Sequence, residues 1–391
     1  MKTAGKRRNL GMRAVIGGAT VCASLLSATA FPQNFDVDSI FLSSAFKQKS
    51  LSGIPYLLEE KEYYKLENGT LYKVQRQAQG KDKKKSVIEP AADARFAAPE
   101  WKPQRFLFNA DFSRVLLLSD IRPIYRRSAT CKAVLWSLDA KGRFSNPWVV
   151  DTLLQEPLFS PDGKKLAFVR QGNLYVADLQ KHEIHAITAD GKENEIRNGH
   201  TDWVYEEEFG FTRAFDWRGD SKALAWLKFD ETSLKQYDMT VWGELYPQTY
   251  QYKYPKAGED NSKVSLWTRE LQDNGRPVAQ AKQVVLRADS VEYLPRMFYP
   301  GGTDRLIFYT LNRPQNHLRI WALEKDGTQT LLYEERNAAY VEVSDDIHFF
   351  ADGTRMLLAS ERDGYRHLYL YRTDGTDTAG LLLTPDMYDV T

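Results

Sequence analysis

Short runs of alternating apolar and polar residues recur along the chain, and each run follows a turn that contains Gly, Asp or Asn. The clearest example starts at Phe159 with a Ser-Pro-Asp-Gly turn and continues through an apolar run at residues 166–169. A second run, at residues 174–179, follows the pair Gly172-Asn173. Alternation with a period of two is typical of β-strands, because successive side chains point to opposite faces of a sheet. The pattern therefore predicts a series of β-hairpins.

The same unit of a Phe, a turn and two strands returns several times. Further copies start at Phe108, Phe215, Phe298 and Phe349, and a hairpin at Asn68 is the candidate for a degenerate first copy. The starts from Phe108 onward lie roughly 51, 56, 83 and 51 residues apart. A four-stranded propeller blade takes about 40 to 50 residues, so all steps but the third are close to one blade. We expect an all-β protein built as a β-propeller, with a β-sandwich as the alternative.

Two segments are expected to depart from the repeat. The long third step contains residues 246–255, in which Tyr and Pro alternate with polar residues. Because Pro cannot donate a backbone hydrogen bond to a sheet, this segment suits an arm or loop outside the regular blade. The lysine-rich stretch at residues 75–92 is interpreted as a solvated loop in preference to a binding patch.

Composition and motifs argue against several classes of function. The chain has 53 Lys and Arg residues against 52 Asp and Glu residues, so a nucleic-acid partner has no support from charge. Phosphate-loop, EF-hand and paired-cysteine motifs do not occur in the sequence. The segment His182-Glu183-Ile184-His185 departs from the His-Glu-x-x-His zinc pattern and is interpreted as a surface strand. We expect no cofactor and no metal site.

Residues 1–30 have the pattern of an export signal. Basic residues precede an apolar run at residues 14–30, which ends in the small-residue sequence Ala-Thr-Ala. No later segment approaches the about 20 apolar residues of a membrane helix. We expect an exported protein, periplasmic or secreted, without a membrane span once the signal is removed. Removal would also take Cys22 and leave Cys131 without an intrachain disulfide partner.

Three consecutive glutamates, residues 206–208, lie between aromatic residues in the stretch 201–209. Asp202 is predicted to cap a short helix there. Neighbouring residues are about 100° apart on a helix but on opposite faces of a strand, so Glu207 and Glu208 can meet one cation only in a helical turn. Each carboxylate about 4 Å from an ammonium gains on the order of 4 kcal/mol at an effective dielectric near 20, before desolvation is subtracted. On the residues alone, a solvated turn is the commoner meaning of such a triplet.

The stretch 202–209, followed by residues 254–258 (Tyr-Pro-Lys-Ala-Gly), resembles the propeller of the dipeptidyl peptidase IV family, especially its bacterial secreted members. Further matching segments are residues 125–128, 159–163, 311–313 and 363–367, and the similarity runs from about residue 100 to the C-terminus. The family's propellers have eight blades, so the resemblance implies an incomplete propeller with about six blades here. We therefore expect three parts: the signal peptide at 1–30, an N-terminal segment with the first blade at 31–100, and the propeller domain at 101–391. By the resemblance, this domain ends before ring closure and before the α/β-hydrolase domain.

The resemblance implies specific roles for four side chains. Glu207 and Glu208 would bind the free α-ammonium of a peptide, while the first glutamate of the triplet would be structural. Arg126 matches an arginine that lies near the substrate carbonyl and the glutamate pair, although Arg127 stands where an aromatic residue or His is commoner. Phe349 matches an aromatic residue that lines the far side of the cleft, with a buried blade residue as the alternative.

The function implied by the resemblance is substrate recognition in a serine exopeptidase that releases N-terminal X-Pro or X-Ala dipeptides from peptides with a free N-terminus. The family's Ser-Asp-His triad lies on the hydrolase domain, and no Gly-x-Ser-x-Gly motif occurs in these 391 residues, so the chain alone is expected to be inactive. The inserted arm resembles a family segment that contributes to homodimer contacts. The alternative function is a non-catalytic periplasmic propeller that binds peptides or proteins.

Overall fold

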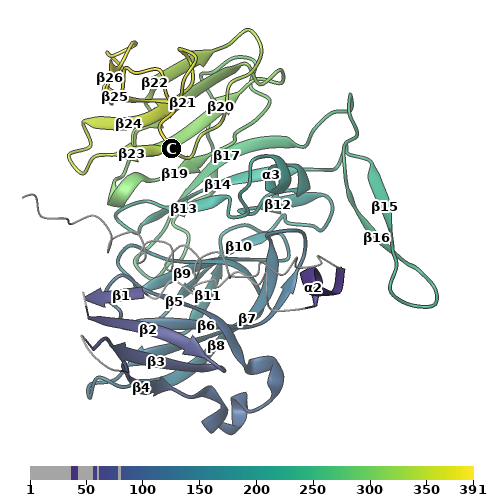
Figure 1. Ribbon diagram of the computed structural model, residues 1–391, viewed down its shortest axis with the longest axis vertical. Helices are drawn as coiled ribbons and strands as arrows, with labels where there is room; N and C mark the ends of the chain where they lie inside the picture. The colour runs from purple at the N-terminus through teal and green to yellow at the C-terminus, as the bar shows by residue number, and fades with distance from the viewer. Residues whose placement is uncertain (1–36, 43–55, 60, 78–80) are drawn as a thin grey trace, which may run out of the picture. The chain divides into compact units, whose positions relative to one another are not determined.

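Figure 1 shows the computed structural model, which describes residues 37–42, 56–59, 61–77 and 81–391. The chain divides into two units, residues 1–54 and 55–391. In the first unit the structure describes one short helix, α2 (Val37–Phe41). The expected export signal lies outside the described residues, and the domain boundaries at residues 30 and 100 stay predictions. Among the helices of the described residues, none has the length and hydropathy needed to cross a membrane.

Apart from a two-stranded arm, the described part of the second unit forms five antiparallel sheets, one of which has seven strands. We divide the seven-stranded sheet in two and call the six resulting units of the propeller-blade type blades 1 to 6. Blade 1 contains β1 (Tyr56–Glu59), β2 (Glu62–Glu67), β3 (Thr70–Gln75) and β4 (Lys83–Ile88). Blade 2 contains β5 (Pro103–Phe108), β6 (Arg114–Pro123), β7 (Ala129–Leu138) and the first part of β8 (Phe144–Phe159). Blade 3 contains the rest of β8, β9 (Lys165–Arg170), β10 (Asn173–Asp178) and β11 (Glu183–Ala186).

The remaining blades follow the same order, with 3-10 helices and one α-helix in the connections (Figure 1). Blade 4 contains β12 (Ile196–Asn198), β13 (Phe215–Trp217), β14 (Ala223–Asp230), β17 (Lys263–Glu270) and β18 (Lys282–Gln283). Blade 5 contains β19 (Met297–Phe298), β20 (Leu306–Leu311), β21 (His317–Leu323) and β22 (Gln329–Arg336), and blade 6 contains β23 (Ile347–Phe349), β24 (Arg355–Ser360), β25 (His367–Arg372) and β26 (Leu381–Leu382). The connecting helices are η1 (Pro90–Ala92), η2 (Ala94–Phe96), η3 (Pro99–Trp101), η4 (Pro300–Gly302) and α3 (Trp203–Glu208).

Two strands show how the chain passes from blade to blade. The 16-residue strand β8 pairs with β7 as far as Leu154 and with β9 from Gln155 onward, so it belongs to both blade 2 and blade 3. Glu156, at the change of partner, has φ of 53°, which turns the strand from one sheet into the next. In blade 4 the first strand is in two pieces, because β12 and β13 both pair with β14. The 16 residues between Asn198 and Phe215 lie outside this pairing and carry α3.

The predicted repeat corresponds to the turn between the first two strands of a blade. In the copies at Phe108, Phe159 and Phe349, the residue that follows the Phe makes two backbone hydrogen bonds. Its N–H donates to the carbonyl of the residue five positions later, and its carbonyl accepts from the N–H of the residue three positions later. In blade 4 the residue that makes these two hydrogen bonds follows Trp217 and not Phe215. The predicted register of that copy is therefore wrong by two residues. The blade 5 turn is longer, since Phe298 pairs with Ile307 nine positions away while the other copies pair with a residue seven positions away.

Neighbouring blades pack through apolar clusters, because both faces of a blade are covered. In β9, Leu166 and Phe168 pack in a cluster with blade 2, while Ala167 and Val169 pack in a cluster with blade 4. All four side chains are fully buried. A strand covered on both faces reads as a nearly continuous apolar run, which is the pattern at residues 166–169. One further cluster joins blades 4, 5 and 6 and includes two aromatic side chains of the α3 region.

Two of the predicted irregular segments are strands. The expected arm is a separate two-stranded sheet, β15 (Gln236–Val241) and β16 (Gln248–Lys253), inserted between β14 and β17. The expected loop at residues 75–92 is wrong in part, because Lys83, Lys84 and Lys85 start β4, the outer strand of blade 1. Their side chains are exposed, and lysines on an edge strand hinder pairing with another sheet.

The repeated turn gives a test of packing between blades. Gly163 and Gly353 occupy the same turn position with φ of 66° and 67°. A Cβ on Gly163 would lie 2.6 Å from Nδ2 of the buried Asn109 of blade 2, whereas a Cβ on Gly353 would enter open space. We expect Gly353→Ala to lower the free energy of unfolding by about 1 kcal/mol, from backbone strain alone. We expect Gly163→Ala to lower it by roughly 2–3 kcal/mol, since the Asn109 amide must also move.

Urea unfolding of the two variants measures the difference. Equal losses of stability would show that the contact between the turns of blades 2 and 3 contributes nothing.

Candidate functional site

Helix α3 is fixed at its start by the side chain of Asp202. Its Oδ1 accepts a hydrogen bond from the N–H of Tyr205 at 2.9 Å, and its Oδ2 accepts one from the hydroxyl of Ser262 at 2.5 Å. The predicted helix cap is therefore confirmed. Burial raises the pKa of Asp202, while the bonds from Ser262 and from the N–H of Tyr205 oppose that shift.

The buried face of α3 is aromatic. Tyr205 is 1% exposed, and its hydroxyl accepts a hydrogen bond from the N–H of Leu294 at 3.0 Å. Its ring packs on Phe209 at 5.0 Å and edge-to-face on Phe229 at 4.8 Å between ring centroids. Because these contacts tie α3 to blade 4 and to the residues that precede blade 5, the helix has a fixed orientation from which its glutamates project.

The first glutamate of the triplet points inward. Glu206 is fully buried, and its Oε1 accepts hydrogen bonds from the N–H groups of Arg127 at 2.5 Å and Ser128 at 2.9 Å. In return, Nη1 of Arg127 donates to the backbone carbonyl of Glu206 at 3.1 Å. The second oxygen, Oε2, has no hydrogen-bond partner among the described residues. Glu206 therefore joins α3 to the turn at residues 124–128.

The second glutamate meets the arginine of that turn. Nε of Arg126 lies 2.9 Å from Oε2 and 3.1 Å from Oε1 of Glu207. The Arg126 side chain is 71% exposed and that of Glu207 is 16% exposed, so the pair lies at the surface of a partly covered site. Glu208 follows on the same helical turn and is exposed. The structure thus brings together three of the four predicted site residues, and it pairs Arg126, not Arg127, with the glutamate.

The fourth predicted residue lies in the interior of another blade. Phe349 ends β23, and its ring packs edge-to-face on Phe298 with 6.0 Å between centroids. It is partly buried against the apolar cluster that joins blades 4, 5 and 6. Because the ring is only partly buried, its predicted place on the far side of the cleft stays a prediction.

A buried ion pair between Arg197 and Glu231 contacts the turn at residues 124–128 through Tyr125. The hydroxyl of Tyr125 accepts a hydrogen bond from Nη2 of Arg197 at 3.2 Å, and Nε of Arg197 donates to Glu231 at 2.5 Å. Burial raises the pKa of Tyr125 to about 12, so this hydroxyl stays protonated at neutral pH. The turn itself is closed by a hydrogen bond from the N–H of Ile124 to the carbonyl of Ser128 at 2.8 Å.

A cavity of about 260 Å³ lies beside this turn, lined by Tyr125, Arg197, His200 and Tyr250 among others. His200 is 8% exposed, and its Nε2 has no hydrogen-bond partner among the described residues. Burial, with a smaller effect from the nearby Arg197 cation, lowers the pKa of His200 to about 3. His200 is therefore neutral at physiological pH and adds no charge to the surroundings of Glu206 and Glu207.

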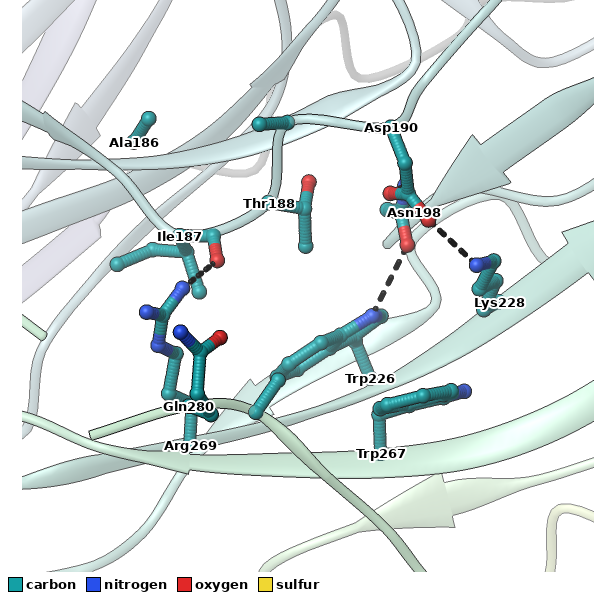
Figure 2. A pocket seen from close by; sticks show the side chains of 12 residues that line it. Ala186, Ile187, Thr188, Asp190, Asn198, Trp226, Lys228, Trp267, Arg269 and Gln280 are labelled. Carbon is teal, nitrogen blue, oxygen red and sulfur yellow. Dashed lines mark hydrogen bonds and ion pairs between the residues drawn. The ribbon is translucent and has the colours of Figure 1, made fainter.

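A second cavity, of about 540 Å³, lies between blades 3 and 4 (Figure 2). Trp226 and Trp267 stack there with 6.4 Å between centroids, and Lys228 pairs with Asp190 at 2.5 Å. Arg269 donates to two backbone carbonyls. Because these polar groups already bond within the protein and Trp226 is only 1% exposed, this cavity offers few free partners to a ligand. It lies apart from the residues of α3 and the turn at 124–128.

The pairing of several supporting residues could not be predicted from the sequence. Arg197 and Glu231 are 34 residues apart, and Ser262 is 60 residues from its partner Asp202. Only the tertiary fold places these pairs together. One local sign existed for Arg197, since a charged residue inside a short strand before the acidic triplet requires a partner if it is buried.

Comparisons with known proteins agree on one family. A family model described as the dipeptidyl peptidase IV (DPP IV) N-terminal region matches residues 109–391. The chain is 30% identical to human (Homo sapiens) prolyl endopeptidase FAP over 278 residues, which are 68% of this chain and 36% of that protein. It is 27% identical to the inactive dipeptidyl peptidase 10 of Rattus norvegicus over 264 residues, 66% of this chain and 33% of that protein.

A solved structure gives the same picture. The crystal structure of Porphyromonas gingivalis dipeptidyl peptidase 4 superimposes with a TM-score of 0.77 at 30% identity, over 91% of this chain and 50% of that chain. The chain thus spans about a third of the length of the two curated relatives and half of the solved structure.

The role of Glu206 predicts a large effect on stability. Glu206→Ala leaves the N–H groups of Arg127 and Ser128 without their acceptor, and we expect it to lower the free energy of unfolding by about 2–4 kcal/mol. Glu206→Gln keeps one acceptor oxygen and is expected to cost less. Urea unfolding is the measurement, and Glu208→Ala, an exposed neighbour, is the control with an expected effect within about 0.5 kcal/mol. Similar stability of the two alanine variants would contradict this role.

His200 predicts a pH dependence. Its pKa is lowered from 6.5 to about 3 in the folded protein, so between these values the unfolded chain binds more protons and stability falls as pH falls. The contribution is complete above pH about 6.5 and is lost progressively toward pH about 3. We expect His200→Asn to flatten the curve of unfolding free energy against pH in this window, and the exposed His348→Asn to leave it unchanged. Parallel curves for wild type and His200→Asn would refute the assignment.

Proposed function

The chain belongs to the dipeptidyl peptidase IV family and forms a propeller portion of the kind found in its N-terminal region, and on this premise we propose that it selects peptides by their free N-terminal amine. The whole protein would be a serine exopeptidase that releases X-Pro or X-Ala dipeptides. The observation that supports this role is the pairing of Arg126 with Glu207 on α3, with Glu208 exposed on the same helical turn.

The arrangement suits a primary ammonium. An ammonium has three N–H donors, and two carboxylates on one helical turn present acceptors to it from two directions. Arg126 supports this geometry because its Nε contacts the carboxylate of Glu207 and compensates part of its charge. With 71% of the side chain exposed, the remaining donors of Arg126 are open to a carbonyl oxygen of the same peptide. Glu206 has no share in binding, since both of its oxygens are buried.

The chemistry of bond cleavage is assigned to another part of the full-length protein. The sequence of this chain contains no Gly-x-Ser-x-Gly nucleophile motif. In this proposal the glutamates fix the amine, and the distance from the amine to the bond after the second residue sets which bond meets the serine. A peptide with a blocked amine would lose the charge that the glutamates recognise.

Export and self-association complete the proposal. Residues 1–30 would direct the protein to the periplasm or the exterior. The arm exposes Trp242, Leu245 and Tyr246 with 76%, 90% and 79% of their surfaces accessible, which fits a contact with a second copy of the protein. No cofactor is part of the proposed mechanism.

A non-catalytic peptide-binding propeller is the second candidate. It is favoured by one observation, the similarity to a relative that is itself named an inactive dipeptidyl peptidase. In both candidates the glutamates bind the amine of a peptide. Activity of the full-length protein on a Gly-Pro chromogenic substrate separates them, since only the exopeptidase releases the chromophore.

The test of recognition is binding of the tripeptide Gly-Pro-Gly and its N-acetylated form, followed by NMR titration. We expect measurable binding only for the free amine. Glu207→Gln and Glu208→Gln keep the side-chain size but remove a charged acceptor, and each is expected to weaken binding by about tenfold or more. Glu183→Gln, an exposed glutamate of β11, is the control. Equal affinity of wild type and both site variants, or equal binding of the acetylated peptide, would refute the proposed recognition.

A further inference from the structure

We propose that Tyr252, at the base of the arm, is a positioning residue that fixes the position of Arg126 relative to helix α3. The inference rests on the proposed function, because it concerns how the ammonium site keeps its geometry. Tyr252 belongs to β16 and is 4% exposed, unlike the aromatic side chains at the tip of the same arm.

The site needs such support because its central ion pair is weak. Arg126 and Glu207 are 81 residues apart, on a turn of blade 2 and on the insertion in blade 4. The Arg126 side chain is 71% exposed, and exposed ion pairs are screened by water and salt. The pair therefore cannot by itself fix the distance between the turn and the helix. Glu206 fixes the backbone of the turn at Arg127 and Ser128, which follow Arg126 in the sequence, whereas Tyr125 precedes it.

Tyr252 contacts both carriers of the ion pair. Its ring lies 5.9 Å from that of Tyr125, the residue before Arg126, at an interplanar angle of 56°. It also lies 6.2 Å from the ring of Trp203, the first residue of α3 and one helical turn before Glu207. One buried ring thus spans the gap between the two segments whose side chains form the ion pair.

The neighbours of Tyr252 on the arm strengthen the same two contacts. The ring of Tyr254 packs edge-to-face on Trp203 at 4.7 Å, and the hydroxyl of Tyr250 donates to the carbonyl of Ile124 at 3.4 Å. Across the hairpin, Tyr237 is the register partner of Tyr252, with 5.9 Å between ring centroids. Cross-strand aromatic pairs stiffen a hairpin, so the base of the arm is a firm support.

This arrangement separates the two ends of the arm. The tip residues Trp242, Leu245 and Tyr246 are largely exposed, whereas Tyr252 at the base is buried. The base has a role in the ammonium site whether or not the tip has a partner. Tyr252 acts on Arg126 and Glu207 through Tyr125 and Trp203, whose rings it contacts.

The test measures affinity of the 391-residue chain for Gly-Pro-Gly by NMR titration, together with the melting temperature. Tyr252→Ala is expected to weaken binding by about fivefold or more, while Tyr252→Phe keeps the ring and is expected to bind within about twofold of wild type. Tyr252→Leu fills the buried space without an aromatic ring and covers the case in which the alanine variant does not fold. Tyr246→Ala, at the arm tip, is the matched control with unchanged affinity.

A double-mutant cycle distinguishes positioning from a general loss of stability. If Tyr252 acts through Arg126, then Tyr252→Leu adds little to the loss already caused by Arg126→Ala, and the two effects are not multiplicative. Fully multiplicative effects, or wild-type affinity of Tyr252→Leu, would overturn the positioning role while the proposed function stands. If Glu207→Gln and Glu208→Gln both bind like wild type, the proposed function is wrong and this inference falls with it.

Discussion

The buried carboxylate of Glu206 is the interaction on which the site depends. It accepts hydrogen bonds from two backbone N–H groups of the turn at residues 124–128. Its own helix, α3, packs in the apolar cluster that joins blades 4 to 6. A carboxylate taken out of water needs such donors, because burial without them costs far more than one hydrogen bond contributes. The same need fixes the turn in place. Arg126 then reaches Glu207 because the residue after it is bonded to Glu206, and not because a surface ion pair draws the segments together.

Blade packing explains how so distant a pair of segments can be aligned. Residues 166–169 of β9 alternate between a cluster with blade 2 and a cluster with blade 4, and all four are fully buried. Each blade is therefore located by both neighbours, and a turn at the end of one blade keeps a constant relation to an insertion two blades later. The insertions in blade 4, α3 and the arm, depart from the regular sheet, and both contact the turn of blade 2. The regular part of the fold supplies position, and the irregular parts supply the chemistry.

Some predictions from the sequence are confirmed and others are wrong. The resemblance to the dipeptidyl peptidase IV family is confirmed by the family match and by the solved relative. The prediction of an all-β fold with propeller blades is also confirmed, as is the cap at Asp202. The predicted register of the copy at Phe215 in blade 4 is wrong because Phe215 and Trp217 are both buried on the same strand. An alternation with a period of two cannot distinguish them. The loop at residues 75–92 was partly wrong because lysines on an outer strand look like those of a loop.

What the sequence determined by itself are the features with a local physical cause. Alternation of apolar residues, Gly and Asn at tight turns and an Asp before a helix all act within a few residues, so they predict strands, hairpins and the cap. Apart from what the family resemblance implies, only the tertiary structure decided which of three adjacent glutamates is buried, which arginine meets Glu207, and that Phe349 packs against Phe298. It also decided that Tyr252 lies between Tyr125 and Trp203. These relations join residues from different blades, and they arise from packing of whole sheets, for which no short stretch of sequence contains the information.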